Sequence, residues 1–404
     1  MQIAVIGVGP RSEIALHIPA IDPGSRVTSA VDVSAAGRER ATRLFGDDVA
    51  LFASHADLIA AQGVVDAAVV CTPDHTHAQI AIDLLGAGIA VYLEKPMALT
   101  IADADAVLEA ARESGSKLYV GHNMRHMAVV TLMRSIIERG EIGEVRSIWC
   151  RHFVGNGGDY YFKDWHAERR YTNTLLLQKG AHDIDVIHFL AGGYSESVSA
   201  LGGLGVYGEV QSRRDNSDKT MPDWFSTDNW PPLAQTDLNP VIDVEDLSMM
   251  MMRLDNGVLA SYQQCHYTPD YWRNFTVIGT AGRLENFGDG DGGVVRVWNR
   301  RQGWNPRGDL EYPIHGDAGG HGDADVITMT EFLRFVADGD PTTTSPIAAR
   351  QAVAAASLAA VSLRSGMTPQ LVPAPASALV DYFDGGQITA MDASAVAPEG
   401  GIGA

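Results

Sequence analysis

The start of the chain holds the pattern that most restricts its fold. Residues 3–6 are a short apolar run that predicts a buried strand, and Gly7-Val8-Gly9-Pro10-Arg11-Ser12 follows and leads into a helical pattern over residues 13–18. Glycines at these positions let the chain turn tightly and let a pyrophosphate approach backbone N–H groups at a helix N-terminus. The third fingerprint position holds serine instead of glycine, so the motif alone is a weak signal. We predict a phosphate-binding turn made by Gly7, Gly9, Pro10, Arg11 and Ser12.

A second apolar run, residues 26–31, ends at Asp32. Its separation from the glycine turn is typical of the carboxylate that binds the adenosine ribose in dinucleotide-binding proteins. A carboxylate there also repels a 2'-phosphate, which favours NAD over NADP. The alternative is that Asp32 is a turn residue or the cap of the next helix, although Ser34 is better placed for that cap.

Strands and helices alternate through the N-terminal part of the chain. Predicted strands at residues 66–71, 90–93 and 118–120 are separated by predicted helices at residues 76–85 and 101–111. This alternation predicts an α/β fold with a doubly wound parallel sheet. Three polar motifs follow strand ends, at the edge where such sheets bind ligands: Thr72-Pro73-Asp74, Glu94-Lys95-Pro96 and His122-Asn123-Met124-Arg125.

A second group of reactive side chains lies in the segment Gln178-Lys179-Gly180-Ala181-His182-Asp183-Ile184-Asp185. Residues three and four apart share one face of a helix, so we expect Lys179, His182 and Asp183 to point toward one place. An imidazole titrates near neutral pH, and a neighbouring carboxylate and ammonium can tune its proton affinity. These residues therefore suit proton transfer; the alternative is a surface helix with a satisfied lysine and histidine.

Taken together, these motifs resemble the Gfo/Idh/MocA oxidoreductases. The resemblance rests on the glycine turn, Thr72-Pro73-Asp74 with His77, Glu94-Lys95-Pro96, residues 121–125 and His182-Asp183-Ile184-Asp185. It implies an NAD-binding Rossmann domain over residues 1–123. It also implies an α+β domain for substrate and oligomerisation over residues 124–372, with a large, open, mostly antiparallel sheet, and a tail over residues 373–404. The implied cofactor-binding residues beyond the glycine turn and Asp32 are Thr72, Pro73, His77, Glu94, Lys95 and Asn123.

The resemblance also implies catalytic roles. The family places the lysine of its Glu-Lys-Pro motif beside the nicotinamide and the substrate, so Lys95 inherits that position, and an ammonium there can stabilise a developing alkoxide. His182 matches the catalytic histidine or tyrosine of the family. Many members carry an aspartate four residues earlier, where this chain has Gln178, so Lys179 and Asp183 become the local substitutes.

Two enzymatic functions follow from this arrangement. The Gln-Lys-x-x-His pattern resembles a subgroup that acts on sugars and glycosides, which implies an NAD-dependent oxidoreductase of a sugar, polyol or glycoside hydroxyl. The alternative is a redox-neutral, NAD-dependent glycoside hydrolase that works by transient oxidation, elimination, water addition and re-reduction. A third class, an NAD-sensing regulatory protein without chemistry, is disfavoured because Lys95 and His182 are both present.

Several polar and aromatic positions are candidates for contact with the substrate. They are Arg125 after the third edge motif, Trp165 and His166 in an aromatic loop, Tyr267 in a linker between predicted strands, and His321 in a glycine-rich segment. Aromatic faces beside hydrogen-bonding groups suit a sugar ring, although packed loop anchors are the alternative. Residues 207–241 lack periodicity, and we expect this long segment to cap the site or to contact another subunit.

Composition excludes several classes of partner. The formal net charge is -20 and no basic tract occurs, which disfavours nucleic acid and anionic membranes. We expect no apolar run long enough to span a bilayer. Three scattered cysteines suggest a reduced, cytoplasmic protein, and the histidine spacings form no strong metal signature, so we expect no metal. The expected small-molecule partner is a carbohydrate substrate. The resemblance also implies that copies of this chain form a homodimer or homotetramer through the open sheet.

Overall fold

The N-terminal part of the chain forms a parallel sheet. The computed structural model describes residues 1–61, 63, 65–316 and 323–388. Six parallel strands pair in the order β3-β2-β1-β4-β5-β6. Their bounds are β1 (Gln2–Ile6), β2 (Arg26–Val31), β3 (Ala50–Phe52), β4 (Ala67–Val70), β5 (Ala90–Leu93) and β6 (Leu118–Val120). The chain reverses its winding between β1 and β4, where doubly wound sheets bind ligands. The predicted Rossmann architecture is confirmed.

Local sequence explains these elements. Strands β4 and β5 are buried along their whole length, as expected for a parallel sheet covered on both faces. The helices that follow the strands are α2 (Ala35–Phe45), α3 (His55–Ala60), α4 (His77–Gly86) and α5 (Ile101–Ser114). Ser34 caps α2 by accepting a hydrogen bond from the Gly37 N–H, and Thr100 caps α5 in the same way through Asp103.

The element after the glycine turn differs from the prediction. Residues 13–18 were expected to begin an α-helix, but the chain forms a 3-10 helix, η1 (Pro10–His17), before the short α1 (Ile18–Ile21). The N-cap position is Gly9, which has no side chain with which to cap the helix. The turn is held instead by Ser12, whose hydroxyl donates to the Gly9 carbonyl over 2.6 Å.

The second sheet is open and mostly antiparallel. Its nine strands pair in the order β14-β13-β12-β11-β7-β10-β9-β8-β15, and only the β7–β10 pair is parallel. The bounds are β7 (Val145–Phe153), β8 (Ser195–Gly203), β9 (Leu247–Leu254), β10 (Leu259–Cys265), β11 (Trp272–Gly279), β12 (Arg283–Phe287), β13 (Val294–Trp298), β14 (Leu310–Pro313) and β15 (Gln370–Leu371). Burial alternates along β9, so one face of the sheet packs inside and the other is open to solvent.

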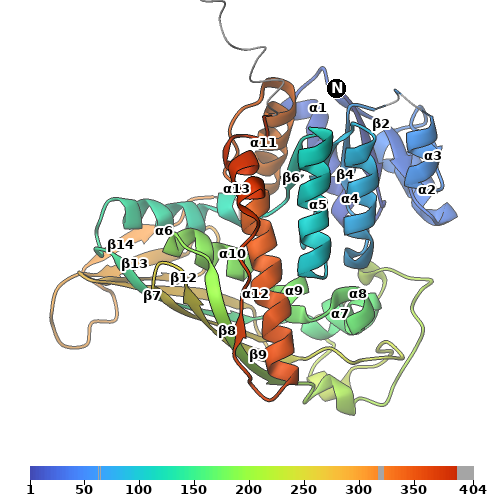
Figure 1. Cartoon of the computed structure of the whole chain (residues 1–404). Coiled ribbons are helices and arrows are strands. Elements are labelled where there is room, and N and C mark those ends of the chain that lie inside the picture. Colours follow the sequence, from blue (N-terminus) through green and yellow to red (C-terminus); the bar gives the residue numbers. More distant parts are fainter. Residues whose placement is uncertain (62, 64, 317–322, 389–404) are drawn as a thin grey trace, which may run out of the picture.

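Helix α12 (Pro346–Arg364) connects the two sheets. It packs against α5 of the first sheet layer and against α10 (Gly180–Ala191) and β8 of the second, and Figure 1 shows it running between them. The expectation that no segment is long and apolar enough to cross a membrane is wrong for this helix. However, 83% of its apolar window is buried inside the protein, as in the core helix of a globular fold.

The C-terminal part of the chain returns to the first domain. Helix α11 (Ala324–Asp338) covers one face of the parallel sheet, with Phe332 packed against the rings of Tyr92 and Tyr119. Helix α13 (Ser377–Asp384) packs against α5, and the Gln387 side chain makes two 2.8 Å hydrogen bonds with the backbone of Leu118 in β6. Residues 377–387 of the predicted tail are therefore packed against the first domain.

The remaining elements surround the space between the two sheets. They are η2 (Asp74–Thr76), η3 (Asn123–His126), α6 (Ala128–Glu138), α7 (Gly157–Tyr161), η4 (Trp165–Ala167), α8 (Arg169–Thr172) and α9 (Leu175–Gln178). The long segment predicted at residues 207–241 contains three short 3-10 helices, η5 (Tyr207–Glu209), η6 (Met221–Asp223) and η7 (Pro232–Ala234). It packs beside α7 through a small core that contains Phe162 and Tyr207.

Candidate active site

The glycine turn after β1 has the geometry of a phosphate-binding turn. Gly7 has a φ of 84°, and a Cβ at this position would lie 2.8 Å from the side chain of Thr72, so only glycine fits. At Gly9 an added Cβ would meet no atom within 4 Å, which leaves open space above the backbone. The Val8 N–H donates to Oδ2 of Asp32 over 2.9 Å, so the predicted ribose carboxylate lies directly beside the turn.

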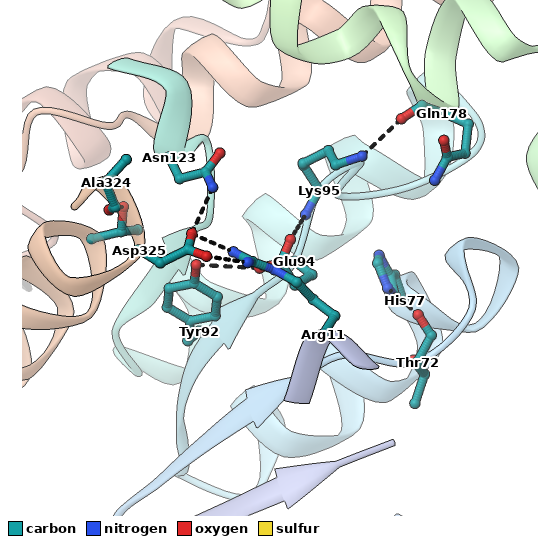
Figure 2. A network of polar contacts seen from close by, with 11 residues as sticks. Arg11, Thr72, His77, Tyr92, Glu94, Lys95, Asn123, Gln178, Ala324 and Asp325 are labelled. Carbon is teal, nitrogen blue, oxygen red and sulfur yellow. Dashed lines mark hydrogen bonds and ion pairs between the residues drawn. The ribbon is translucent and has the colours of Figure 1, made fainter. Parts of the chain in front are cut away.

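An ionic network around Arg11 supports the glycine turn (Figure 2). Arg11 donates to Glu94 through Nε over 2.6 Å and makes two hydrogen bonds of 2.5 and 2.9 Å with Asp325 of α11. Asn123 donates to the same Asp325 carboxylate over 2.6 Å and is fully buried. Asn123 thus supports the network through its Nδ2, whereas its Oδ1 has no hydrogen-bond partner within the described residues, so the cofactor contact predicted for Asn123 stays a prediction. Asp325 was missed because no local pattern connects it to the glycine turn.

The Glu94-Lys95-Pro96 turn is fixed to the Thr72 turn by a histidine. His77 is buried, and its two ring nitrogens lie 2.7 Å from the Pro96 carbonyl and 2.8 Å from the Thr72 carbonyl. The Lys95 backbone N–H also donates to Glu94 over 3.2 Å. These contacts direct the Lys95 side chain out of the parallel sheet, and its ammonium donates to the Gln178 carbonyl over 2.9 Å (Figure 2).

The reactive segment, which was predicted as one helix, contains two helices that meet at Lys179. Helix α9 ends at Gln178, α10 begins at Gly180, and Lys179 occupies the junction between them. His182 lies in the first turn of α10, is 3% exposed, and packs edge-on against His122 with ring centroids 6.2 Å apart. Lys95, Lys179 and His182 are thus brought to one region from both halves of the chain.

Asp183 was expected to tune His182, but its hydrogen bonds and ion pairs within the described structure are with the second sheet, and it also acts on the charge of Lys179. Its carboxylate accepts from Tyr262 over 2.8 Å, lies 2.9 Å from Nδ1 of His152 and pairs with Nε of Arg273 at 3.0 Å. All three partners come from strands of the second sheet, and Asp183 is fully buried. The Arg273 charge and the His152 hydrogen bond hold the pKa of Asp183 far below its usual value despite burial. Asp183 therefore anchors α10 to the sheet as an ionised carboxylate.

The predicted substrate residues have different surroundings. Arg125 is buried and makes a bidentate pair with Asp185, at 2.7 and 2.8 Å, so we reassign it from substrate contact to structural support. Tyr267 packs against the small core of residues 204–244 and not at the Lys95 region. His321 lies outside the described residues.

Trp165 and His166 remain near the site. Their rings stack with centroids 3.8 Å apart, and Nδ1 of His166 lies 2.6 Å from the Asp164 carboxylate. His166 is also close enough to Asp74 to influence its ionisation. The structure therefore leaves these two residues as candidates for substrate contact.

Burial and neighbouring charges shift the proton affinities of the site. Burial lowers the pKa of Lys95, although Asp74 and Glu94 oppose the shift. Burial, together with the Arg273 and Lys95 charges, lowers the pKa of Lys179 to about 7. An amine with this pKa can accept a proton at physiological pH, which an ordinary lysine cannot.

Two buried polar atoms beside Lys95 mark a site for a polar ligand. Oδ2 of Asp74 and Oε1 of Gln178 have no hydrogen-bond partner within the described part of the chain. Burial raises the pKa of Asp74, which is only 4% exposed. Unpaired buried acceptors are costly, so a ligand that donates hydrogen bonds fits this position. Asp74 belongs to the Thr72-Pro73-Asp74 motif, but no local pattern singled it out as a contact for a ligand.

Comparisons with known proteins agree with this geometry. Residues 1–122 match the model of the oxidoreductase family with an NAD-binding Rossmann fold, GFO_IDH_MocA, and residues 130–285 match the GFO/IDH/MocA C-terminal domain. The chain belongs to the Gfo/Idh/MocA family. The resemblance inferred from the motifs is therefore confirmed, as is an NAD-binding domain at the N-terminus.

Relatives in the Gfo/Idh/MocA family include sugar and polyol dehydrogenases. The chain is 31% identical to inositol 2-dehydrogenase of Gluconacetobacter diazotrophicus over 50% of its own length and 56% of the relative. It is 27% identical to levoglucosan dehydrogenase of Pseudarthrobacter phenanthrenivorans over 67% and 70% of the two lengths. Other curated relatives are matched over 52% and 60% of their lengths, so the chain spans little more than half of several of them.

A solved structure of levoglucosan dehydrogenase in complex with NADH and levoglucosan has the same fold. It superimposes with a TM-score of 0.73 at 20% identity and covers 92% of this chain and 99% of that one. At this identity the likeness establishes the fold, including the placement of the open sheet after the Rossmann domain.

The residues of this Gfo/Idh/MocA protein fit NAD. The positive φ at Gly7 and the open space above Gly9 suit close approach of a pyrophosphate, and Asp32 presents a carboxylate beside the turn. Ser34 donates to the other oxygen of Asp32 and caps α2, so the capping role weighed for position 32 belongs to Ser34 and the ribose role of Asp32 stays a prediction.

The charge of Asp32 leads to a prediction about the preference for NAD over NADP. Asp32→Asn keeps the side-chain shape and one acceptor for the Val8 N–H but removes the charge that repels a 2'-phosphate. We expect the ratio of Kd values for NADP and NAD to fall by about 10-fold or more. Titration of both cofactors by calorimetry measures this ratio, with the exposed Asp47→Asn as a control. An unchanged ratio would remove Asp32 from the ribose site.

Proposed function

We propose that this protein is an NAD-dependent oxidoreductase that oxidises a hydroxyl of a sugar, polyol or glycoside. The observation that carries the proposal is the 2.9 Å contact between the Lys95 ammonium and the Gln178 carbonyl. This contact holds the ammonium from the NAD-binding domain beside Lys179 at the α9–α10 junction and close to the start of α10, which carries His182. Unpaired acceptors of Asp74 and Gln178 lie at the same place, where hydroxyl donors of a carbohydrate would satisfy them.

Each residue has a separate task in this proposal. The glycine turn, Thr72, Pro73 and Asp32 hold the cofactor, which when bound supplies the acceptor for the hydride. Lys95 donates a hydrogen bond to the reacting oxygen and stabilises the negative charge that develops there. His182 accepts the proton of that hydroxyl. Trp165 and His166 provide an aromatic wall for the ring of the substrate.

A product assay tests this proposal. The purified protein is incubated with NAD and a panel of neutral sugars, polyols and glycosides, and NADH formation is followed by absorbance. We expect NADH only with a subset of the panel, and a new ketone or lactone in the mass spectrum. NAD binding without turnover on any carbohydrate would contradict the proposal and favour a sensing role.

The second candidate is the redox-neutral glycoside hydrolase, and Lys179 favours it. Oxidation of a ring carbon acidifies the neighbouring C–H, so elimination of a glycosidic leaving group needs a second base besides the one that takes the hydroxyl proton. Lys179, with a pKa of about 7, can serve as that base while His182 takes the hydroxyl proton. Release of an aglycone without net NADH, dependent on catalytic amounts of NAD, would distinguish this reaction from simple oxidation.

The low pKa of Lys179 predicts a pH dependence. The neutral amine is the form that accepts a proton, and its fraction rises as pH increases through about 7. We therefore expect kcat/KM of the wild type to rise between about pH 6 and 8, and Lys179→Gln to lose this rise. If kcat/KM of Lys179→Gln is lower but still rises with pH at the same midpoint as in the wild type, Lys179 has only a structural role.

We also propose a cytoplasmic homodimer or homotetramer that forms through the open sheet. The solvent face of that sheet carries large apolar side chains, including Trp149, Met251 and Leu259, each more than half exposed. Trp149 and Met251 both pair with Ser261 in the strand ladder, so they lie on one face of the sheet, on either side of Ser261. A second copy of the chain would cover this patch. Light scattering of the purified protein measures the number of subunits.

A further inference from the structure

A cavity between α7 and the long segment after β8 is separate from the Lys95 region. It has a volume of about 240 Å³, and its lining includes Asn156, Asp159, Thr227, Trp230, Gln235 and Pro269. Thr227, Trp230 and Pro269 are exposed and form its open side, whereas Asp159 and Gln235 are buried in its floor. The lining contains none of the residues assigned to the reaction, so a ligand here would not be the reacting molecule.

Hydrogen bonds hold the two walls of this cavity together. The Asp159 carboxylate accepts from Nδ2 of Asn229 over 2.8 Å, and the Asp159 carbonyl accepts from the indole N–H of Trp224 over 2.8 Å. Nε2 of Gln235 donates to the Asn229 carbonyl over 3.2 Å. A Cβ at Gly158 would lie 2.2 Å from Nε2 of Gln235, so the close approach of the two walls requires glycine at that position. The shape of the cavity is therefore set by the protein itself.

The floor of the cavity holds a buried acceptor. Gln235 is 5% exposed, and its Oε1 accepts no hydrogen bond within the described residues. A buried acceptor is costly to leave unpaired, so a molecule that donates a hydrogen bond fits beside it. The side chains of Asn156 and Thr227, which also line the cavity, can both donate and accept hydrogen bonds.

The charge and shape of the lining favour one neutral, polyhydroxylated ring. Asp159 is the single charged residue among the described residues of the lining, and the Lys163 ammonium lies 3.0 Å from its carboxylate. A phosphate would therefore meet no unpaired cation, and an ammonium ligand no unpaired carboxylate. Trp230 is 46% exposed and offers an aromatic face beside the amide and hydroxyl groups. Pockets for drug-sized ligands measure about 300–1,000 Å³, so this smaller cavity suits a single sugar or cyclitol ring.

Three distant parts of the chain meet at this cavity. They are α7 with the residues before it, the long segment after β8, and the linker after β10 that contains Pro269. Tyr161 of α7 packs edge-on against His166, with ring centroids 5.6 Å apart, and against His266 at the start of the linker, at 5.0 Å. A ligand in the cavity would therefore restrain the long segment against a helix that also borders a candidate substrate residue.

We propose that this cavity is a binding site for a free neutral monosaccharide or cyclic polyol, which clamps residues 224–235 onto α7. Trp230 stacks on the apolar face of the ring, and a ring hydroxyl donates to Oε1 of Gln235. The bound ring favours the closed arrangement of the segment, so occupancy slows its local opening. The site goes beyond the proposed oxidoreductase function and does not depend on it, because none of its residues takes part in the proposed reaction.

Hydrogen exchange measured by mass spectrometry locates the bound ring without use of the reaction. The protein is titrated, without NAD, with a panel of neutral hexoses and inositols. At a ligand concentration of ten times Kd, we expect amide exchange in residues 155–160 and 224–235 to slow by about 10-fold. Trp230→Ala removes the aromatic face, and Thr227→Trp fills the cavity from its exposed side. Both variants should lose this protection, with Kd raised by about 10-fold or more.

Trp304→Ala is the matched control, because Trp304 is 91% exposed and lies outside the cavity. An NAD affinity within about 3-fold of the wild type shows that the variants are folded. Protection of residues 155–160 and 224–235 without turnover of any carbohydrate would leave this site standing and contradict the oxidoreductase function. Protection confined to elements around Lys95, or protection that both variants keep, would show that sugars bind elsewhere and would overturn the site. No protection by any ring of the panel, as expected if water alone fills the cavity, or tighter binding of sugar phosphates would also overturn it.

Discussion

Lys95→Met is expected to reduce kcat by at least about 10²–10³-fold while NAD still binds. The ammonium reaches from the NAD-binding domain to the α9–α10 junction, where it donates to the Gln178 carbonyl. Removal of one donor that stabilises a developing oxyanion costs about 10²–10³ in rate. Methionine retains the length of the side chain and fills the same volume, so the fold should tolerate it.

Separate measurements of binding and turnover test this prediction. Calorimetric titration with NAD should give a Kd within about 3-fold of the wild type, which on the energy scale is under about 1 kcal/mol. Lys219→Met in the long segment after β8 is the control for loss of a lysine elsewhere. Full activity of Lys95→Met would remove Lys95 from the reaction in both candidate functions.

Asp183→Asn is expected to destabilise the protein by about 3–5 kcal/mol, because it removes the nearer of the two carboxylates, Asp183 and Asp289, that pair with the buried Arg273 guanidinium. The variant also weakens the contacts with His152 and Tyr262. The midpoint of urea unfolding, followed by tryptophan fluorescence, measures the loss. Glu138→Gln removes the partner of Arg134 in an exposed ion pair and should change stability by less than about 1 kcal/mol.

The effect of Asp183→Asn should depend on pH. The pKa of Asp183 is lowered in the folded protein, so its contribution to stability is present above the ordinary aspartate pKa and is lost as pH falls toward the folded-state value. The stability difference from wild type should therefore narrow in acid. If the variant unfolds like the wild type and loses only activity, Asp183 belongs to the reacting site, as the sequence suggested.

The sequence was sufficient for the elements whose signals are local. The glycine turn, Asp32 and the Glu94-Lys95-Pro96 motif all follow strands of one parallel sheet, and their order fixes the edge at which they meet. Helical spacing also placed His182 on a helix, although that helix, α10, begins only at Gly180, after Lys179. In each of these cases, residues that are adjacent in the sequence determine both the functional group and its position in the fold.

Partners that come from distant strands could not be predicted in this way. Asp183 was assigned to His182, but its contacts are made by His152 and Arg273 from the β7–β11 ladder. Arg125 was assigned to the substrate, but it is paired with Asp185, which lies on α10. Helical periodicity shows which residues share a face, but it does not show which other element packs on that face.

The return of the C-terminal part to the first domain affects synthesis on the ribosome. The parallel sheet is complete once β6 has been made. One of its faces is nevertheless covered by α11, and the backbone of Leu118 is hydrogen-bonded to the side chain of Gln387. The nascent N-terminal domain must therefore wait for residues 324–387 to be made before its apolar surface is covered, although domains generally fold in the order of their translation. Fragments that end near the first domain boundary should accordingly aggregate or recruit chaperones, and the dinucleotide site should mature only after α11 and Gln387 have been made.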